Sequence, residues 1–205
     1  MKVLIASQNA HKIAELTPIL QETGFEVTDA RGLQLVEPEE DGKTFIANAR
    51  IKAEAAKAAT GLVVLADDSG LVVEALSAEE EFPGVETAPY AKSLGGYDKA
   101  VVDIFDRLQD RPADCHYYSV LILSYPDGRE IVATGRVDGV LRPGPKGEGT
   151  FGFDPWFEIK GNGKRFAELT TEEKNKLSHR GLALKDLLEK LKGLPKGPHE
   201  LRAVS

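Results

Sequence analysis

The sequence predicts an α/β fold in which helices flank a mixed central sheet. Apolar runs typical of buried strands occur at 2–6 and 62–66, and stretches with helical periodicity lie at 13–20 and 97–108. The segment 117–140 has apolar stretches on both sides of a Pro-Asp-Gly turn, which predicts a hairpin. Strands that alternate with helices, together with a hairpin, indicate a mixed α/β architecture.

The first half of the chain is expected to alternate between strands and helices. The first apolar run ends at a polar turn, and apolar residues at helical spacing follow at 13–20. The stretch 44–59 is rich in Ala, Lys and Glu and lacks Gly and Pro, which predicts a helix that Gly61 stops. A buried strand at 62–66 comes next, and the chain continues as strand over 71–76.

The second half is expected to contain a loop and two further helices after the hairpin. The segment 141–149 is too rich in Gly and Pro for regular structure. Thr170, followed three residues later by Glu173, is a capping-box pattern that opens a short helix. Ser178 can cap the last helix, which is expected to end near Gly193.

The composition indicates one folded domain. Of the 205 residues, 41% are hydrophobic and 29% are charged, close to the averages of globular proteins, so the chain can bury a sizeable core. Neither an internal repeat nor a domain linker is visible in the sequence. We therefore expect a single two-lobed domain over 1–193, followed by a loose tail at 194–205.

Charge and hydropathy argue against several classes of function. The net charge of -7 disfavours a broad nucleic-acid surface, which depends on many Lys or Arg contacts to phosphate. The start of the chain becomes polar too early for a signal peptide and no apolar stretch is long enough to span a bilayer, so we expect a cytoplasmic protein without membrane contact. The lone Cys115 is predicted to be a buried thiol rather than a nucleophile.

The strongest local feature is the acidic pair Asp67 and Asp68, followed by Ser69, at the end of a predicted strand. Sheets of α/β proteins bind ligands at such strand ends. Mg²⁺ prefers oxygen ligands and keeps several waters, so one or two carboxylates plus substrate phosphates can hold it, and Glu39 is a candidate second ligand. An ordinary Asp-Gly turn explains the same residues, and this motif alone leaves both interpretations open.

A second candidate site is the turn between the first strand and the first helix, where free backbone N–H groups and the positive helix end favour phosphate. Lys12 would add a point charge there, whereas Ser7 or Asn9 could instead simply cap the helix. The turn consists of Ser7, Gln8, Asn9, Ala10, His11 and Lys12. It is not a Walker loop, because GxxxxGK[ST] does not occur, and the GxGxxG match at 147–152 lacks the helix that a dinucleotide site needs.

Aromatic and cationic residues nearer the C-terminus form a third candidate site. Phe151 and Phe153 belong either to the core or to a pocket in which an aromatic ring stacks on a base. Lys174 lies one turn before His179 and Arg180, so these side chains converge on a carbonyl or phosphate acceptor or form a solvated basic face. Zinc proteases, zinc ribbons and α/β-hydrolases lack support, because the motifs HExxH, CxxC and GxSxG are absent.

Taken together, these pieces resemble the inosine triphosphate pyrophosphatase family, also called the XTP/dITP diphosphatases. The resemblance spans nearly the whole chain through six ordered motifs, which are Ser7-x-Asn9-x-x-Lys12, Glu39-Glu40-x-Gly42-x-Thr44-Phe45-x-x-Asn48-Ala49, Ala66-Asp67-Asp68-Ser69-Gly70-Leu71, Pro83-Gly84-Val85, Phe151-Gly152-Phe153-Asp154-Pro155, and Glu173-Lys174-Asn175 leading to Ser178-His179-Arg180-Gly181. It implies an elongated, two-lobed fold of the Maf/Ham type with a central substrate cleft, usually assembled as a homodimer.

The resemblance also implies roles for individual residues. Asp68 would bind Mg²⁺ together with Glu39 and would activate the attacking water, and Mn²⁺ would be able to replace Mg²⁺. The turn from Ser7 to Lys12 would bind the triphosphate, and Ser69 would contact the substrate beside Asp68. The base and sugar pocket would consist of Phe151, Gly152, Phe153 and Asp154, with Lys174, His179 and Arg180 reading a 6-keto purine. The phosphate site would be supported by Glu40, Asn48, Lys52 and Asp67.

The implied reaction is attack of water on the α-phosphorus of ITP, dITP or XTP, which releases the nucleoside monophosphate and pyrophosphate. A metal neutralises the developing charge and a base takes the proton. Cationic donors pair with a keto oxygen at purine position 6 but face an amine donor in adenine.

Two rival interpretations remain. The first is a Maf-type pyrophosphatase that acts on other nucleotides, against which Lys174, His179 and Arg180 count. The second is a nucleotide-binding regulator without turnover, against which the intact Glu39 and Asp68 count.

Two regions depart from the family pattern. After Pro-Gly-Val the family has approximately Tyr-Ser-Ala-Arg-Tyr, whereas this chain has Glu86-Thr87-Ala88-Pro89-Tyr90, which loses an aromatic residue and an Arg. In the glycine-rich run before the pocket, Thr150 stands where the family generally has Gly, and Phe153 stands where Tyr is more usual. We expect the replacements at Thr150 and Phe153 to alter the width of the pocket or the dimer contact.

Overall fold

The computed structural model describes residues 1–22, 24–33, 35–78, 80–148 and 151–192. Within these ranges six strands form one sheet in the order β2-β1-β3-β4-β5-β6. β1 pairs in parallel with β2 and β3, and the remaining neighbours are antiparallel, so the predicted mixed sheet is confirmed. The strands are β1 (Lys2–Ile5), β2 (Glu26–Asp29), β3 (Val63–Val73), β4 (Ala113–Ser124), β5 (Glu130–Leu141) and β6 (Phe157–Ile159).

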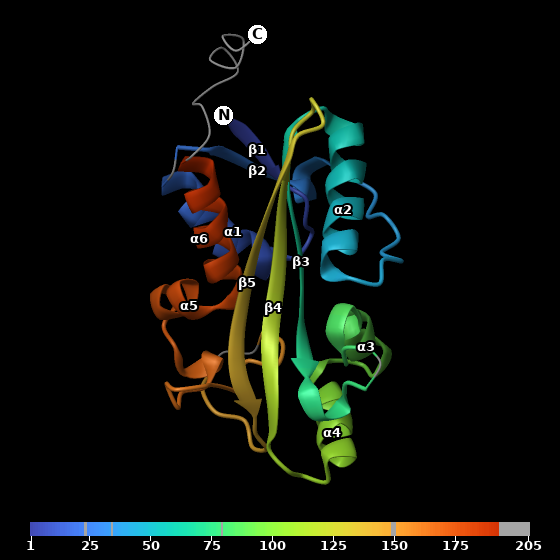
Figure 1. The fold of residues 1–205 in the computed structure, drawn as a ribbon, viewed down its shortest axis with the longest axis vertical. Coiled ribbons are helices and arrows are strands. Elements are labelled where there is room, and N and C mark those ends of the chain that lie inside the picture. The colour runs from blue at the N-terminus through green and yellow to red at the C-terminus, as the bar shows by residue number, and fades with distance from the viewer. Residues whose placement is uncertain (23, 34, 79, 149–150, 193–205) are drawn as a thin grey trace.

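Helices cover both faces of this sheet. In the described part of the chain they are α1 (Ala10–Glu22), α2 (Phe45–Thr60), α3 (Thr87–Ser93), α4 (Tyr97–Leu108), α5 (Thr171–Leu177) and α6 (His179–Lys192). Figure 1 shows the long strands β3, β4 and β5 running along the long axis, with α1 and α6 on one side, α2 on the other, and α3 and α4 near the lower end. No helix in the described ranges is long and apolar enough to cross a bilayer. The tail expected at 194–205 lies outside the described residues.

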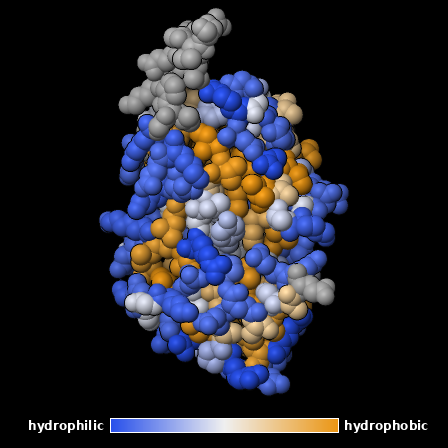
Figure 2. All heavy atoms as spheres, in the orientation of Figure 1, coloured by the Kyte–Doolittle hydropathy of each residue, from blue (hydrophilic) through white to orange (hydrophobic). Residues whose placement is uncertain are grey.

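Three apolar clusters hold these elements together. One joins β1, β3 and β4 to α1 and α6, and a second joins β3 and β4 to α2. The third packs α4 against the other end of the sheet and includes Phe153 and Cys115, whose thiol pKa is raised by burial, as expected for a structural cysteine. In Figure 2 apolar residues gather at the upper centre of one face, over the sheet between α6 and α2, with hydrophilic residues around them.

The helix ends form as the sequence predicts. Thr44 caps α2 through its side chain, and Gly61 ends the helix with a φ of 65°, a backbone conformation that favours glycine. Thr170 and Glu173 form the predicted capping box at the start of α5. The hydroxyl of Ser178 accepts a hydrogen bond from the first turn of α6. Local chemistry therefore sets the positions of these helices.

The main correction concerns the acidic pair. Asp67 and Asp68 do not follow a strand end and do not form a turn, because β3 continues through them to Val73 and pairs with β4 on the way. The strand predicted at 71–76 is correspondingly too long, since 74–76 form a 3₁₀ turn. The carboxylates are therefore held in the middle of a strand paired on one side with β4.

Short elements escaped the sequence pattern. β2 is a half-buried edge strand, β6 has only 3 residues, and α3 contains Pro89 within its first turn. Such segments carry too few residues for periodicity to identify them. β4 also begins at Ala113, earlier than the predicted 117.

Candidate active site

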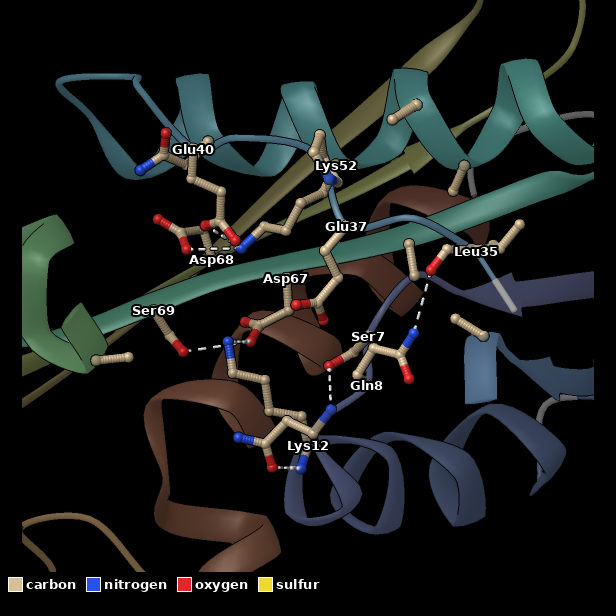
Figure 3. Close-up of a pocket in the computed structure, with 18 of the residues that line it drawn as sticks. Ser7, Gln8, Lys12, Leu35, Glu37, Glu40, Lys52, Asp67, Asp68 and Ser69 are labelled. Carbon is tan, nitrogen blue, oxygen red and sulfur yellow. Dashed lines mark hydrogen bonds and ion pairs between the residues drawn. The ribbon is translucent and has the colours of Figure 1, made fainter. Parts of the chain in front are cut away.

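The two acidic residues of β3 face opposite sides of the sheet, because side chains alternate along a strand. Asp67 follows the direction of Leu65, which packs against α1 and α6. Asp68 follows that of Ala66, which packs against α2. Figure 3 shows Lys12 reaching from α1 toward Asp67, and Lys52 reaching from α2 toward Asp68. Each carboxylate thus has its own cation.

Asp67 is a buried carboxylate with both oxygens occupied. Its Oδ2 lies 2.7 Å from Lys12 Nζ and 3.4 Å from Arg180 Nε, and it accepts a hydrogen bond from Ser69 Oγ at 3.2 Å. Its Oδ1 accepts a hydrogen bond from Ser119 Oγ at 2.7 Å. Burial by itself raises the pKa of Asp67, but Lys12 and Arg180 outweigh burial and hold the pKa well below its usual range. These contacts therefore favour the charged form of Asp67.

Asp68 is almost as deeply buried but has a single hydrogen-bond partner in the part of the chain that the structure describes. Lys52 Nζ donates to its Oδ1 at 2.8 Å, while Oδ2 is buried without a hydrogen-bond partner among the described residues. Burial raises the pKa of Asp68 to about 6, although Lys52 opposes the shift. A carboxylate with a free oxygen and a pKa near neutrality is suited to accept a proton or to ligate a cation.

The acidic segment, residues 35–42, runs over the α2 side of β3. Gln8 Nε2 donates to the Leu35 carbonyl at 3.3 Å, and Gly42 N donates to Asn48 Oδ1 at 2.8 Å. A Cβ at Gly42 would lie 2.5 Å from Asn48 Oδ1, so only glycine allows this close approach. Lys52 also contacts Glu40 Oε2 at 2.9 Å. The segment is thereby fastened at both ends.

The carboxylates of this segment differ in placement. Glu37 and Glu40 line the cleft, and Figure 3 shows Glu37 near Asp67 and Glu40 beside Asp68. Glu39, the expected second metal ligand, is exposed and is not among the lining residues. Across the described ranges, His, Cys, Asp and Glu side chains nowhere gather in threes in a way that could hold a metal ion. In this conformation Lys52 is the cation that bridges Glu40 and Asp68.

The main cleft, of about 830 Å³, lies between these elements. The β1–α1 turn forms one wall, α2 and the acidic segment form another, and β3 contributes Asp67, Asp68 and Ser69. The segment 85–89 closes the third side and includes the exposed Glu86 and Pro89 that depart from the family pattern. Gly70 lets this wall approach, since a Cβ there would lie 2.3 Å from the Gly84 carbonyl. The volume falls in the range of small-molecule sites.

The β1–α1 turn has the geometry of a helix cap. Asn9 Oδ1 accepts hydrogen bonds from the backbone N–H groups of His11 and Lys12 at 3.0 and 3.3 Å, and Ser7 Oγ accepts one from Asn9 N at 3.1 Å. The capping role weighed from the sequence is therefore confirmed. Ala10 is the first residue of α1. The turn still presents a helix N-terminus and Lys12 to the cleft, which is where an anion is favoured.

A second hollow, the aromatic pocket, adjoins the main cleft and shares Asn9, Lys12 and Ser69 with it. Its remaining lining is Gly70, Thr87, Ala88, Tyr97, Tyr117, Phe151, Gly152, Phe153, Asp154, Lys174, His179 and Arg180. Phe153 is fully buried and packs edge-on against Tyr97, so it belongs to the core. Phe151 is half-buried with Lys174 Nζ 5.3 Å from its ring centre, so it is the aromatic ring better placed to stack on a ligand.

The cations of the aromatic pocket are held by carboxylates. Lys174 Nζ lies 2.7 Å from Asp154 Oδ2 and 3.1 Å from Glu15 Oε1. Arg180 is paired with Glu15, and its Nη2 donates to Ser69 Oγ at 3.1 Å. Burial raises the pKa of Glu15, but Arg180 and Lys174 outweigh burial and lower it overall. The solvated basic face considered from the sequence is therefore wrong for Arg180, which is buried.

His179 occupies the same pocket as a neutral ring. It stacks on Tyr117 with ring centres 4.6 Å apart, and its Nδ1 is buried without a hydrogen-bond partner among the described residues. Burial, reinforced by Arg180, holds the pKa of His179 well below its usual value. The ring therefore offers a polar atom without adding charge.

The structure brings most of the predicted residues together around the two hollows and adds others that the sequence did not single out. Three predicted residues, Ala10, His11 and Glu39, are exposed and line neither hollow, although the His11 ring lies 4.6 Å from that of Phe151. Glu15, Tyr97, Tyr117 and Ser119 all touch the predicted residues. Glu15 had a usable signal, because it lies three residues after Lys12 on one helix and therefore near the same face. The others come from α4 and β4, which only the folded sheet places beside β3.

The fold and the site together are typical of a ligand-binding α/β protein. The sheet is mixed and elongated, and the cleft combines a buried carboxylate pair, a helix N-terminus and a cationic aromatic pocket. A family profile described as the Ham1 family matches residues 3–190. With almost the whole chain matched, the chain belongs to the Ham1 family.

Curated relatives are similar in sequence to this chain over nearly its full length. A dITP/XTP pyrophosphatase of Corynebacterium glutamicum is 43% identical and covers 93% of this chain and 97% of its own. One from Thermus thermophilus is 41% identical, with coverage of 95% and 94%.

Solved structures show the same fold. A HAM1 protein from Coxiella burnetii has a TM-score of 0.81 at 33% identity and covers 95% of this chain and all of its own. A nucleoside-triphosphatase (dITP/XTP pyrophosphatase) from Mycobacterium abscessus has a TM-score of 0.73 at 38% identity, with coverage of 93% and 100%. The elongated Ham1-type architecture expected from the sequence is therefore confirmed.

Proposed function

We propose that this protein hydrolyses dITP, XTP and ITP to the nucleoside monophosphate and pyrophosphate. The observation that carries the proposal is Asp68, a buried carboxylate with one unpartnered oxygen in the described structure and a raised pKa, which lines a cleft beside a helix N-terminus. The names of the relatives support the substrate class. Together they favour a base that activates water next to a bound triphosphate.

The walls of the cleft divide the work of binding. Lys12 and the N-terminus of α1 bind the triphosphate, whose negative charge suits both. Asp68 takes the proton from the attacking water, because it is the carboxylate of the pair whose pKa lies near neutrality. Ser69 contacts the substrate beside it. The water oxygen bonds to the α-phosphorus, and the bond from that phosphorus to the oxygen bridging the α- and β-phosphates breaks. The bridging oxygen leaves with pyrophosphate, and the nucleoside monophosphate is the other product.

The donor set suits a small hard cation. Asp68 Oδ2 lacks a partner in the described structure, and Glu40 contacts Lys52, the lysine that also contacts Asp68. One or two carboxylates plus substrate phosphates are enough for Mg²⁺ or Mn²⁺. When bound, the ion would neutralise charge on the phosphates. Glu39 serves as the second ligand only if the acidic segment shifts, since Glu39 is exposed here.

The aromatic pocket reads the base. Phe151 stacks on the purine, which does not discriminate among purines because their faces are alike. Lys174 and Arg180 donate to a keto oxygen at position 6, and the amine of adenine leaves these donors unpaired. His179 Nδ1 adds an uncharged contact.

A pyrophosphate-release assay tests the proposal. We expect turnover of ITP, dITP and XTP with Mg²⁺ or Mn²⁺, little with ATP, poor activity with Ca²⁺, and none in excess EDTA. Preference for a pyrimidine or an unmodified nucleotide would favour a Maf-type substrate range instead. Binding of ITP without release of pyrophosphate would favour a regulator that has lost turnover, and full activity in EDTA would remove the metal from the mechanism.

The homodimer and the cytoplasmic location stay predictions. Sedimentation of the purified chain measures the first directly. A mass of one chain at micromolar concentration would contradict it.

A further inference from the structure

The hydroxyl of Ser119 makes a single hydrogen bond among the described residues, and its partner is the buried carboxylate of Asp67. Ser119 is on β4, directly opposite Ser69 of β3, and its exposed fraction is 0%. Its Oγ donates to Asp67 Oδ1 at 2.7 Å. Cross-strand neighbours on one face of a sheet are held at fixed spacing, so this contact is set by the β3–β4 register.

Asp67 is the carboxylate that touches both halves of the site within the described residues. Its Oδ2 lies 2.7 Å from Lys12, on the triphosphate side, and 3.4 Å from Arg180, on the base side. A carboxylate can rotate about its Cβ–Cγ bond. Ser119 removes this freedom by holding Oδ1, which turns Oδ2 toward both cations.

We propose that Ser119 is a positioning residue that fixes Asp67 and thereby aligns triphosphate binding by Lys12 with base discrimination by Arg180. The proposal rests on the function proposed above. Without the hydroxyl, Oδ1 is left buried without its donor, and the carboxylate reorients or draws water to satisfy it. Lys12 and Arg180 are then no longer held by one carboxylate oxygen in a fixed position.

The fold offers a matched control. Ser124 lies on the same strand, is 1% exposed, and its hydroxyl accepts from Lys57 at 3.0 Å and donates to Glu54 Oε1 at 3.4 Å. None of these three residues lines the cleft. Removal of either hydroxyl deletes one buried serine oxygen from β4. A purely structural effect should therefore be similar in both variants.

The test measures kcat and KM for ITP and ATP with the wild type, Ser119→Ala and Ser124→Ala. In Ser119→Ala we expect KM to rise for both nucleotides and kcat/KM for ITP to fall about ten-fold, the lower end for a hydrogen bond to a charged group. The ITP/ATP ratio should fall about three-fold or more. Ser124→Ala should keep the wild-type KM and ratio.

Graded restoration provides a second measurement. Ser119→Cys keeps a weak donor at the same position and should give an intermediate ratio. It also replaces the alanine variant in the comparison should that variant fail to fold. A folded Ser119 variant with wild-type KM and ratio, or an equal change in Ser124→Ala, overturns the positioning role. A wild type that releases no pyrophosphate from ITP instead overturns the proposed function, so the two failures are distinct.

Discussion

Asp67 and Asp68 are consecutive residues of β3, yet one faces α1 and α6 while the other faces α2. Among the described residues, Asp67 has Lys12, Arg180 and two hydroxyls as partners, whereas Asp68 has only Lys52, which contacts one of its oxygens. Both are buried, so desolvation acts on both in the same direction. The opposite pKa shifts of the two carboxylates therefore come from the number of partners on each face, not from the chemical group or from depth.

The largest expected effect is on turnover at the α2 face. Asp68→Asn should lower kcat for ITP by roughly 10² to 10⁴-fold, because it removes the proton acceptor and weakens a cation site. Pyrophosphate release by the folded variant measures this, with the exposed Asp98→Asn as control. A variant that keeps more than about a tenth of the wild-type kcat, a loss below about 1.4 kcal/mol, would show that Asp68 is not the base.

Replacing each aspartate by asparagine should change the free energy of unfolding by different amounts on the two faces of the sheet. Asp67→Asn removes the anion shared by the half-buried Lys12 and the buried Arg180, which keeps Glu15, and should lower the free energy of unfolding by about 3 kcal/mol. Asp68→Asn should be neutral or stabilising, since burial already disfavours the charged form of Asp68. Urea unfolding in EDTA measures both. Equal losses would mean that the two carboxylates do not differ as their partners indicate.

The raised pKa of Asp68 should make the free energy of unfolding depend on pH. Its pKa is about 6 in the folded protein and near the ordinary 3.8 when unfolded, so between these values the folded state binds more protons. Stability contributed by the protonated form is therefore lost as pH rises from about 4 to 6, by on the order of 2 kcal/mol. The stability of Asp68→Asn minus that of the wild type, measured in EDTA, should grow over this window. A constant difference would contradict the raised pKa.

On the α6 face the expected effect is on selectivity. Arg180→Ala should reduce kcat/KM for ITP and XTP far more than for ATP, shrinking the preference by about 1 to 3 kcal/mol, or about 5 to 150-fold. Arg31→Ala, which removes an exposed arginine, should leave the ratio unchanged. If Arg180 instead serves the triphosphate, both nucleotides should lose efficiency by a similar factor, and an unchanged ITP/ATP ratio would rule out base reading.

The smallest expected effect concerns the cleft wall. Glu86 is exposed and adds negative charge to a cleft proposed to bind a triphosphate. Glu86→Gln should lower KM for ITP by up to about five-fold at low salt and by less at higher ionic strength. Glu80→Gln, at an exposed position outside the lining, serves as control. An unchanged KM at low salt would show that the charge of Glu86 does not affect substrate binding.

Sequence motifs identified much of the site because its pieces are local. The turn from Ser7 to Lys12 is one helix cap, and Thr170 with Glu173 is another. Asp67 and Asp68 stood out by adjacency alone. Their setting was mispredicted, since two carboxylates in a row suggest a turn. A strand tolerates them here because Lys12 and Lys52 arrive from helices far away in the sequence.

By itself the sequence determined the mixed α/β class, the caps of its main helices, and most of the polar residues that line the cleft, but not its apolar lining such as Ala30, Leu35 and Ala56. Those features depend on short-range periodicity and on side chains near their own backbone. Only the tertiary structure decided which carboxylate of the pair keeps an unpartnered oxygen in the described structure, that Glu15 holds Arg180, that Ser119 holds Asp67, and that Glu39 faces outward. These depend on which elements meet across the sheet, and burial and charge pairing take their values only when those distant segments are in contact.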